Sequence, residues 1–285
     1  SELIYWFKTP QKYWLNKKNI SPKEPFIHHP EEVYVSNYQK SKLITKVIQE
    51  FEIDNINIID DLKKLNIKDQ LVENGIFTPK NSMFTKEKEI RELVRSLYAN
   101  LSRHNKINRI YVKSKSNKEE YFISDNVVVE LIHAKLNLSR LAEAWIKLLF
   151  ISKFRKNIKH THVIFREENE YKSHILQSPG AIESNLILEE YINLFKNYSE
   201  KCLPLPPEST YKYVEAKIKL KNEKKVFSDR WIGNKTFSNS KGERDNIEMK
   251  MCFGNKKEPD FFFENQKFDK LSFRLYGPLI KALNK

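Results

Sequence analysis

Residues 127–154, "VVVELIHAKLNLSRLAEAWIKLLFISKF", decide the fold class. The run begins with β-branched and apolar residues, a composition that favours a strand. From Leu138 to Phe154 the apolar residues recur at helical spacing, which predicts a helix. A strand that leads closely into a helix is typical of α/β domains, so we expect an α/β fold.

Shorter β-rich runs lie on both sides of this segment. "INRIYVKS" (residues 107–114) and "EEYFIS" (residues 119–124) are separated by the polar turn "KSKSNK", an order that predicts an antiparallel meander. "THVIFRE" and "EYKSHILQ" predict a second hairpin around Glu168 and Asn169. The expected core is therefore a small mixed sheet with several added helices.

Helical patterns extend the domain at both ends. They cover residues 41–51, 60–74 and 85–104 before the sheet, and residues 181–201 after it. We divide the chain into an N-terminal helical segment, residues 1–104, and an α/β domain with C-terminal helices, residues 105–285. The apolar stripe expected on the third helix consists of Ile90, Val94, Leu97 and Leu101.

The first twenty residues are aromatic and apolar. Trp6, Phe7, Trp14 and Leu15 are too apolar to remain solvated together. We expect them to pack against the rest of the domain or against a neighbouring subunit. Residues 1–104 would then join the preceding part of a longer subunit.

The chain carries a formal net charge of +14 over 285 residues, which suggests a polyanionic partner such as nucleic acid. Only ten of its 51 basic residues are Arg, and Lys, Asn and Ile are abundant throughout. An AT-rich genome produces this composition in any protein. A basic interaction module unrelated to DNA therefore stays open as a further reading.

Few residues suggest metal or redox chemistry. Two cysteines are too few for a disulfide framework and indicate a reducing cytoplasm. His28-His29 and the pair His160 and His162 lack the further ligands that a zinc site needs. No apolar run is long enough to span a membrane. We expect no bound metal and no membrane association.

Residues 242–254, "GERDNIEMKMCFG", contain Asp245, Glu248 and Lys250. An acid followed by Glu-x-Lys is the skeleton of many magnesium-dependent nucleases. In such a site, however, the two carboxylates converge from adjacent strands, and Asp245 and Glu248 are too close in sequence for that. Their spacing after Gly242 fits a capping box instead, with Asp245 at the helix start and Glu248 reaching back. We expect a structural cap.

Several stretches together resemble the C-terminal region of the gamma subunit of bacterial exodeoxyribonuclease V, the RecC family. Each motif is weak alone, but the order and spacing run over nearly the whole chain. The stretches are "LIYWFKTPQKYWLNKKNI", "EPFIHHPEEVYVSNYQKSKL", "LVENGIFTP", "LSRLAEAWIKLLF", "CLPLPPEST" and "RWIGN…GERDNIEMKMCFG…FRLYGPLIKAL".

The resemblance implies a restriction-endonuclease-like core (the PD-(D/E)XK nuclease type) whose active site is degenerate. In active relatives, the strand before the helix would read acid-x-Lys; here His133 and Lys135 occupy these places. A neutral imidazole does not replace a carboxylate on Mg²⁺, which prefers oxygen ligands. The nearby acids Asp125 and Glu130 keep an alternative open. It is an active Mg²⁺-dependent DNA exonuclease that uses Asp125, Glu130 and Lys135.

The resemblance also implies a scaffold that helps to part the DNA duplex and braces two motor subunits. The implied partners are the beta and alpha subunits of exodeoxyribonuclease V and a double-stranded DNA end or fork. The implied setting is cytoplasmic, in double-strand break repair and recombination. The domain itself would need no cofactor, and only the alternative requires Mg²⁺.

Two turns are candidates for a hairpin that contacts DNA. The first carries Lys113, Lys115 and Lys118, and the second carries Arg166 and Lys172. Cations on such a turn would hold phosphates, although a lysine-rich turn can equally be a solvated loop. The residues that would stiffen the first stem by cross-strand packing are Tyr111, Tyr121 and Phe122.

Overall fold

In the computed structural model, the described residues are 2–21, 80–104, 106–113, 118–233, 241–255 and 257–283. The helices expected at residues 41–51 and 60–74 lie outside this part of the chain. The described residues form two units. One is built on a sheet and the other is helical, and each is described by itself.

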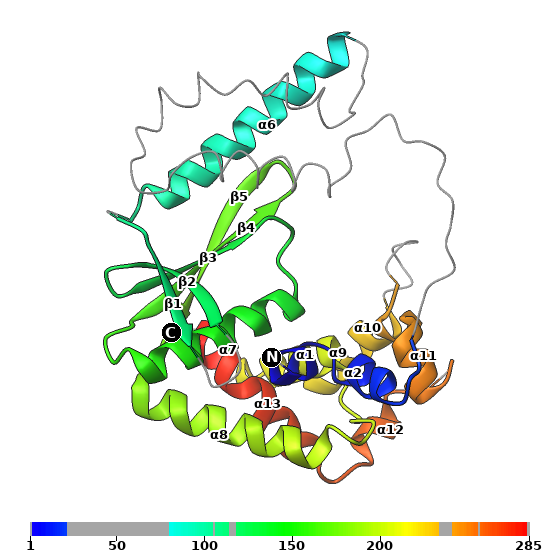
Figure 1. The fold of residues 1–285 in the computed structure, drawn as a ribbon. Coiled ribbons are helices and arrows are strands. Elements are labelled where there is room, and N and C mark those ends of the chain that lie inside the picture. Colours follow the sequence, from blue (N-terminus) through cyan, green and yellow to red (C-terminus); the bar gives the residue numbers. More distant parts are fainter. Residues whose placement is uncertain are drawn as a thin grey trace. The chain divides into compact units, whose positions relative to one another are not determined.

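The sheet unit contains five strands in the order β1-β2-β3-β4-β5 (Figure 1). β1 pairs antiparallel with β2, and β2 with β3, whereas β3 and β4 are parallel. The predicted meander, the second hairpin and the mixed α/β class are thereby confirmed. The strands are β1 (Asn108–Lys113), β2 (Lys118–Ser124), β3 (Val127–Ile132), β4 (His160–Glu167) and β5 (Glu170–Gln177).

Two tight turns fix the register of the hairpins. Asp125 begins the connection from β2 to β3, and Glu168 begins the connection from β4 to β5. Both have a left-handed backbone, with φ of 51° and 53°. Such a conformation suits short turns between antiparallel strands, because its twist matches that of the strands.

Helix α6 (Lys80–Leu101) covers one face of the sheet (Figure 1). The predicted stripe is confirmed, since all four of its residues are buried. Leu97 and Leu101 join a core cluster with Val129 of β3 and Ile164 of β4. Burial of this apolar area is the main contribution to holding the helix on the sheet.

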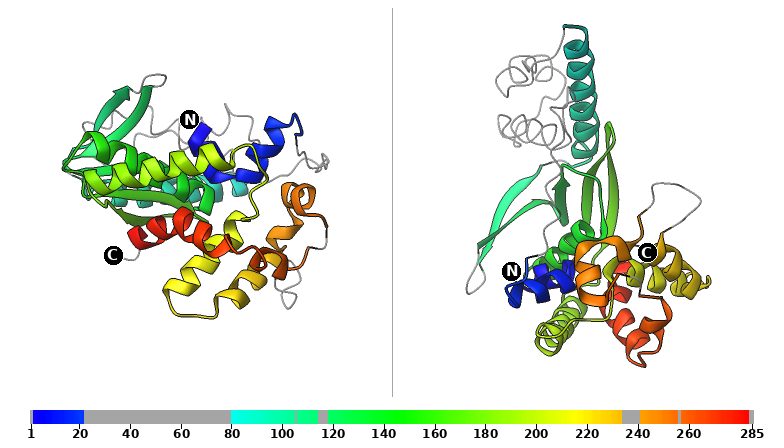
Figure 2. Two further views of the ribbon diagram at one scale, coloured as in Figure 1. Left: turned by 90° about the horizontal axis from the view of Figure 1, so that it is seen from below. Right: turned by 90° about the vertical axis from the view of Figure 1, so that its right-hand side faces the viewer.

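The helical unit combines residues 2–21 and 138–157 with the described residues from 177 onward. Helices α9 and α10 lie side by side in it (Figures 1 and 2). Its helices are α1 (Glu2–Lys8), α2 (Pro10–Lys17), α7 (Leu138–Phe154), α8 (Ala181–Tyr198), α9 (Pro207–Ile218), α10 (Glu223–Ile232), α11 (Ile247–Phe253), α12 (Asp260–Phe263) and α13 (Phe268–Leu283), with a 3₁₀ turn at Glu243–Asp245.

The N-terminal aromatic residues are part of the core of this unit. Trp6 and Phe7 are buried, with Trp6 5.7 Å from Phe195 and Phe7 4.7 Å from Tyr191, between ring centroids. Leu15 is also buried, and Trp14 is half-buried. The prediction that this stretch packs against the rest of the chain is confirmed.

The two units do not follow the division expected between residues 104 and 105. Helix α6 groups with the sheet, because its apolar stripe needs the face that the sheet offers. Residues 2–21 group instead with helices far along the chain. The junction of residues 1–104 with a longer subunit stays a prediction. Within the described residues, no helix has both the length and the apolar content to cross a membrane.

Candidate functional site

The residues of the alternative nuclease site do not converge. Asp125 lies in the turn before β3, and Lys135 lies beyond the other end of that strand. The six residues of β3, at a rise of about 3.3 Å per residue, put the two ends of the strand about 17 Å apart. Glu130 is in the middle of the strand, level with Val163 of β4. Mg²⁺ ligands lie about 2 Å from the ion, so Asp125 and Lys135 cannot act on one metal.

His133, in the place where an acid was sought, follows β3 directly and belongs to a neutral hydrogen-bonded pair. Its Nδ1 lies 2.8 Å from the hydroxyl of Tyr171. Burial lowers the pKa of His133, and the nearby charge of Arg166 lowers it further. Burial also raises the pKa of Tyr171 well above its ordinary value. Both side chains are therefore neutral at pH 7.

Tyr171 is itself fixed by helix α6. Its backbone N–H donates to Ser96 Oγ at 2.8 Å, and its carbonyl oxygen accepts from Asn100 Nδ2 at 3.0 Å. These bonds join β5, α6 and the end of β3 into one network. The hydrogen bonds of His133 and Tyr171 therefore connect elements of the sheet unit, and both side chains are neutral. We assign this pair a structural role.

The first candidate DNA hairpin has the expected stem. Six pairs of residues link β1 and β2, from Asn108 opposite Ile123 to Lys113 opposite Lys118. Lys115 and the side chains of Lys113 and Lys118 lie outside the described part of the structure.

The aromatic residues of this stem do not form one cluster. Tyr111 is opposite Glu120, whereas Tyr121 is opposite Ile110, so the two tyrosines point to different faces. Tyr121 is buried and Tyr111 is half exposed. On the face of Tyr111, Arg109 pairs with Glu120 at 2.8 Å and lies 5.5 Å from the ring centroid of Phe122. The stem is thus stiffened by a charged and an aromatic contact.

The two cations of the second candidate hairpin lie in different environments, one buried and one exposed. Arg166 is only 4% exposed, because β4 lies between β3 and β5 and is buried on both faces. Lys172 is exposed, but its Nζ lies 2.9 Å from Glu167 and 3.3 Å from Glu170. The burial of Arg166 corrects the expectation that it contacts phosphates, whereas a phosphate contact of Lys172 stays a prediction.

Of the two histidines of β4, His160 and His162, the second contacts His104, which follows helix α6. His162 is buried, and its Nδ1 lies 2.7 Å from Nε2 of His104. Burial lowers the pKa of His162 to about 4, with His104 adding to the shift. Across the described ranges, no group of three His, Cys, Asp or Glu residues is suited to a metal ion.

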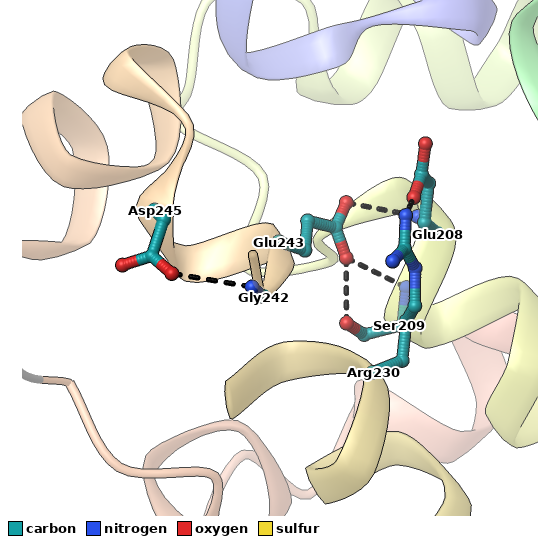
Figure 3. Close-up of polar contacts among 6 residues, drawn as sticks. All are labelled: Glu208, Ser209, Arg230, Gly242, Glu243 and Asp245. Atoms are coloured by element: carbon teal, nitrogen blue, oxygen red, sulfur yellow. Dashed lines mark hydrogen bonds and ion pairs between the residues drawn. The ribbon is translucent and has the colours of Figure 1, made fainter. Parts of the chain in front are cut away.

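The stretch at residues 242–254 begins with a 3₁₀ turn, Glu243–Asp245, before helix α11. Asp245 accepts a hydrogen bond from the N–H of Gly242 at 3.2 Å (Figure 3). The N-cap of α11 is Asn246, without a side-chain cap, because the turn moves the helix start one residue on. The cap predicted for Asp245 therefore stabilises the turn and not α11, and among the described residues Glu248 forms no cap bond.

Glu243 is the acid of this stretch with the most hydrogen bonds to distant residues, and the local sequence pattern did not predict its role. Its Oε1 accepts from the N–H of Glu208 at 2.9 Å, and its Oε2 accepts from the N–H and the hydroxyl of Ser209, each at 2.6 Å (Figure 3). These donors belong to the first turn of α9, whose N-cap, Pro206, has no side-chain donor or acceptor. A carboxylate here satisfies free N–H groups and suits the helix dipole.

Glu243 is buried, and its surroundings shift its pKa. It is only 2% exposed, and burial raises its pKa to about 7, while the donors of Ser209 and the charge of Arg230 lower it. Arg230 pairs with Glu208 beside it (Figure 3).

A Cβ on Gly242 would lie 2.3 Å from the carbonyl oxygen of Trp231, so only glycine fits before Glu243.

These observations define an α/β module with a mixed five-stranded sheet. Residues 83–218, from helix α6 to the end of α9, match the family model described as the RecC C-terminal domain. The match confirms the resemblance to the C-terminal region of the exodeoxyribonuclease V gamma subunit. A search of the curated proteins finds no match.

Proposed function

We propose that this chain is a non-catalytic DNA-handling and subunit-docking domain of an exodeoxyribonuclease V gamma subunit. The observation that carries the proposal is the match of residues 83–218 to the RecC C-terminal domain. That family suggests a part of the RecBCD complex, an ATP-dependent helicase and nuclease for double-strand break repair and recombination. The cytoplasm is the proposed location, and no cofactor is assigned to the domain itself.

The absence of catalysis is supported by strand β3. Its two ends separate Asp125 from Lys135, and His133 pairs with Tyr171 where a metal-binding acid would be needed. The alternative of an active exonuclease is not favoured by this arrangement. The part of the complex that cuts DNA would then be another subunit.

A restriction-endonuclease-like ancestry is supported by the order of elements. Strand β3 lies beside β2 and leads into helix α7, and the chain returns as β4 parallel to β3. In a nuclease of that class, paired acids come from adjacent strands of this kind. We infer that the sheet keeps the architecture of a restriction-endonuclease-like nuclease and has lost the metal-binding acid, whose place His133 occupies.

The proposed docking role has a candidate surface on helix α8. Ile182 and Leu186 are 82% and 60% exposed, and they lie one turn apart on the same face of the helix. Exposed apolar pairs of this kind are typical of surfaces that a partner covers. The alpha or beta subunit is the partner that the proposal assigns.

The proposal is tested by capturing the tagged chain from a mixture with the alpha and beta subunits. We expect retention of at least one of them, and a lower yield with Ile182→Glu plus Leu186→Glu. Asn197→Glu, at an exposed position of the same helix, serves as the matched control. Capture of neither subunit by the unsubstituted chain would contradict the docking role.

A further inference from the structure

The turn between α9 and α10 presents a leucine to the solvent. Leu220 is 94% exposed, more than any other large apolar side chain in the described part of the chain. Its backbone is left-handed, with φ of 54°, a conformation that favours glycine and costs energy for a residue with a side chain. Neither burial nor backbone preference therefore accounts for a leucine at this position.

Backbone hydrogen bonds fix this turn. The N–H of Leu220 donates to the carbonyl oxygen of Lys217 at 3.2 Å, and the N–H of Lys221 donates to that of Ala216 at 2.8 Å. This pattern is a Schellman motif, in which the left-handed residue is usually glycine. The motif needs only the backbone of Leu220, so its side chain is left for another role.

The two helices that carry the turn are fixed as well. Asn222 caps α10 by accepting from the N–H of Lys225 at 3.0 Å. Phe227 of α10 is fully buried. Its ring centroid lies 6.5 Å from that of Tyr213 in α9 and 5.6 Å from that of Phe268 in α13. Leu220 therefore projects from a rigid pair of helices.

Cations flank the leucine on both sides. Residues 217–225, "KIKLKNEKK", contain five lysines and one acid. Two of the lysines are neutralised within the helical unit. Lys217 pairs with Asp269 at 2.7 Å, and Lys219 pairs with Glu215 at 2.8 Å. The charge of the turn therefore depends on the other three.

These three, Lys221, Lys224 and Lys225, are exposed and form no ion pair with any residue that the structure describes. Lys224 Nζ lies 5.4 Å from the ring centroid of Phe263, a contact that leaves its charge in place. Lys224 and Lys225 are in the first turn of α10, where the helix dipole disfavours a cation. They do not serve the helix, and their charge is available to an anion.

We propose that the α9–α10 turn is a duplex DNA contact, at which Leu220 inserts between stacked bases while Lys221, Lys224 and Lys225 bind the neighbouring phosphates. Apolar wedges, leucine among them, unstack base steps in this way, and lysines hold the backbone. Lysine is depleted in the cores of protein–protein interfaces, so DNA is favoured over a protein partner. The proposal rests on the DNA-handling role proposed above and names a surface for it.

The first test measures base unstacking. The 285-residue chain is added to linear and forked duplexes that carry 2-aminopurine at successive positions, and binding is followed by anisotropy. We expect the 2-aminopurine fluorescence to rise on binding and the rise to be lost with Leu220→Gly. This variant should melt at the same or a higher temperature, because glycine suits the left-handed backbone. Met251→Ala, at another exposed apolar position, is the control and should keep the rise.

The second test measures the salt dependence of duplex binding. Replacing Lys221, Lys224 and Lys225 together with Gln should lower the slope of log affinity against log salt by about 2–3, since each phosphate contact contributes about 0.9. The matched control replaces three exposed lysines elsewhere in the helical unit with Gln: Lys12, Lys196 and Lys201. It should leave the slope unchanged.

The outcomes separate this surface from the function on which it rests. If the chain binds no duplex, both proposals are overturned. If it binds without a fluorescence rise, if Leu220→Gly keeps the rise, or if the two lysine variants change the slope equally, only the surface is wrong. If Leu220→Gly lowers the capture of the alpha or beta subunit and leaves DNA binding intact, the turn docks a protein and the proposal is overturned.

Discussion

Residues 242–253 and the end of strand β3 both carry the residue types of a metal-dependent nuclease, yet they are held in different ways. In the first region, a buried carboxylate, Glu243, is saturated by three donors from helix α9. In the second, His133 and Tyr171 form a neutral pair, and the acids lie elsewhere along the strand. The comparison teaches that the donors around an acid, rather than its motif, decide its role.

The largest expected effect on stability is that of replacing Glu243, and a fold that is equally stable without it would contradict the comparison. Replacing Glu243 with Ala leaves the first turn of α9 without its acceptor, since the N–H groups of Glu208 and Ser209 both depend on it. We expect a loss of roughly 3–5 kcal/mol in the free energy of unfolding, measured by urea denaturation. Glu264→Ala, at an exposed position, should change it by less than about 0.5 kcal/mol.

Substituting Gly242 with Ala probes the backbone packing of the same region. A Cβ there would lie 2.3 Å from the carbonyl oxygen of Trp231, so Gly242→Ala must displace helix α10 or the 3₁₀ turn. The expected cost is about 3 kcal/mol, read from the same denaturation curves. Gly277→Ala is the matched control: its nearest neighbour would be Phe273 at 3.6 Å, and a stable or slightly stabilised chain is expected. Equal effects of the two changes would refute the account of Gly242.

The pH dependence of stability distinguishes Glu243 from the buried histidine of strand β4, His162, by sign. Burial raises the pKa of Glu243 from 4.5 to about 7, so the folded chain holds this proton more tightly than the unfolded chain. Its contribution to stability is complete below about pH 4.5 and is lost as the pH rises to about 7, by up to roughly 3 kcal/mol. Burial lowers the pKa of His162 from 6.5 to about 4, and its contribution is instead lost as the pH falls through that range.

Measuring the melting temperature from pH 4 to 8 for the unsubstituted chain and for Glu243→Gln isolates the acid, because His162 is common to both. The difference between the two curves should change steadily between about pH 4.5 and 7 and be flat above. A difference that stays constant throughout the range would show that the pKa of Glu243 is the same in the folded and the unfolded chain, which would contradict the raised pKa.

Asp245 should have a smaller effect, since it is exposed and makes one bond, to the N–H of Gly242. Asp245→Ala is expected to lower the free energy of unfolding by roughly 1 kcal/mol, the usual value of a cap. Glu248→Ala, without a cap bond, should cost less than about 0.5 kcal/mol. A larger loss from Glu248 than from Asp245 would restore the capping box predicted from the sequence.

Local patterns predicted much of the fold. The meander, the second hairpin and helix α7 follow from the periodicity of neighbouring residues, which needs no knowledge of distant contacts. The division into two units did not follow, because residues 2–21 find their partners in α8 and α13. Such a grouping depends on tertiary packing alone.

The site residues were harder to predict, for two physical reasons. Arg166 was placed on a turn, but the apolar run before it belongs to a strand buried on both faces, a pattern typical of central strands. Glu243 was missed because its donors are 34 and 35 residues away. The one local signal was the Pro206-Pro207 start of α9, which leaves the N–H groups of the first turn without a neighbouring cap.

Cleavage of DNA tests the central claim most directly, and here the expected effect is zero. Labelled linear duplex DNA is incubated with the chain and Mg²⁺ or Mn²⁺, beside Asp125→Ala, Lys135→Ala and Asp245→Ala variants. The account predicts no degradation by any of them, because Asp125 and Lys135 lie at opposite ends of β3 and Asp245 serves a turn. Degradation by the unsubstituted chain that any one of these substitutions abolishes at unchanged stability would contradict the account.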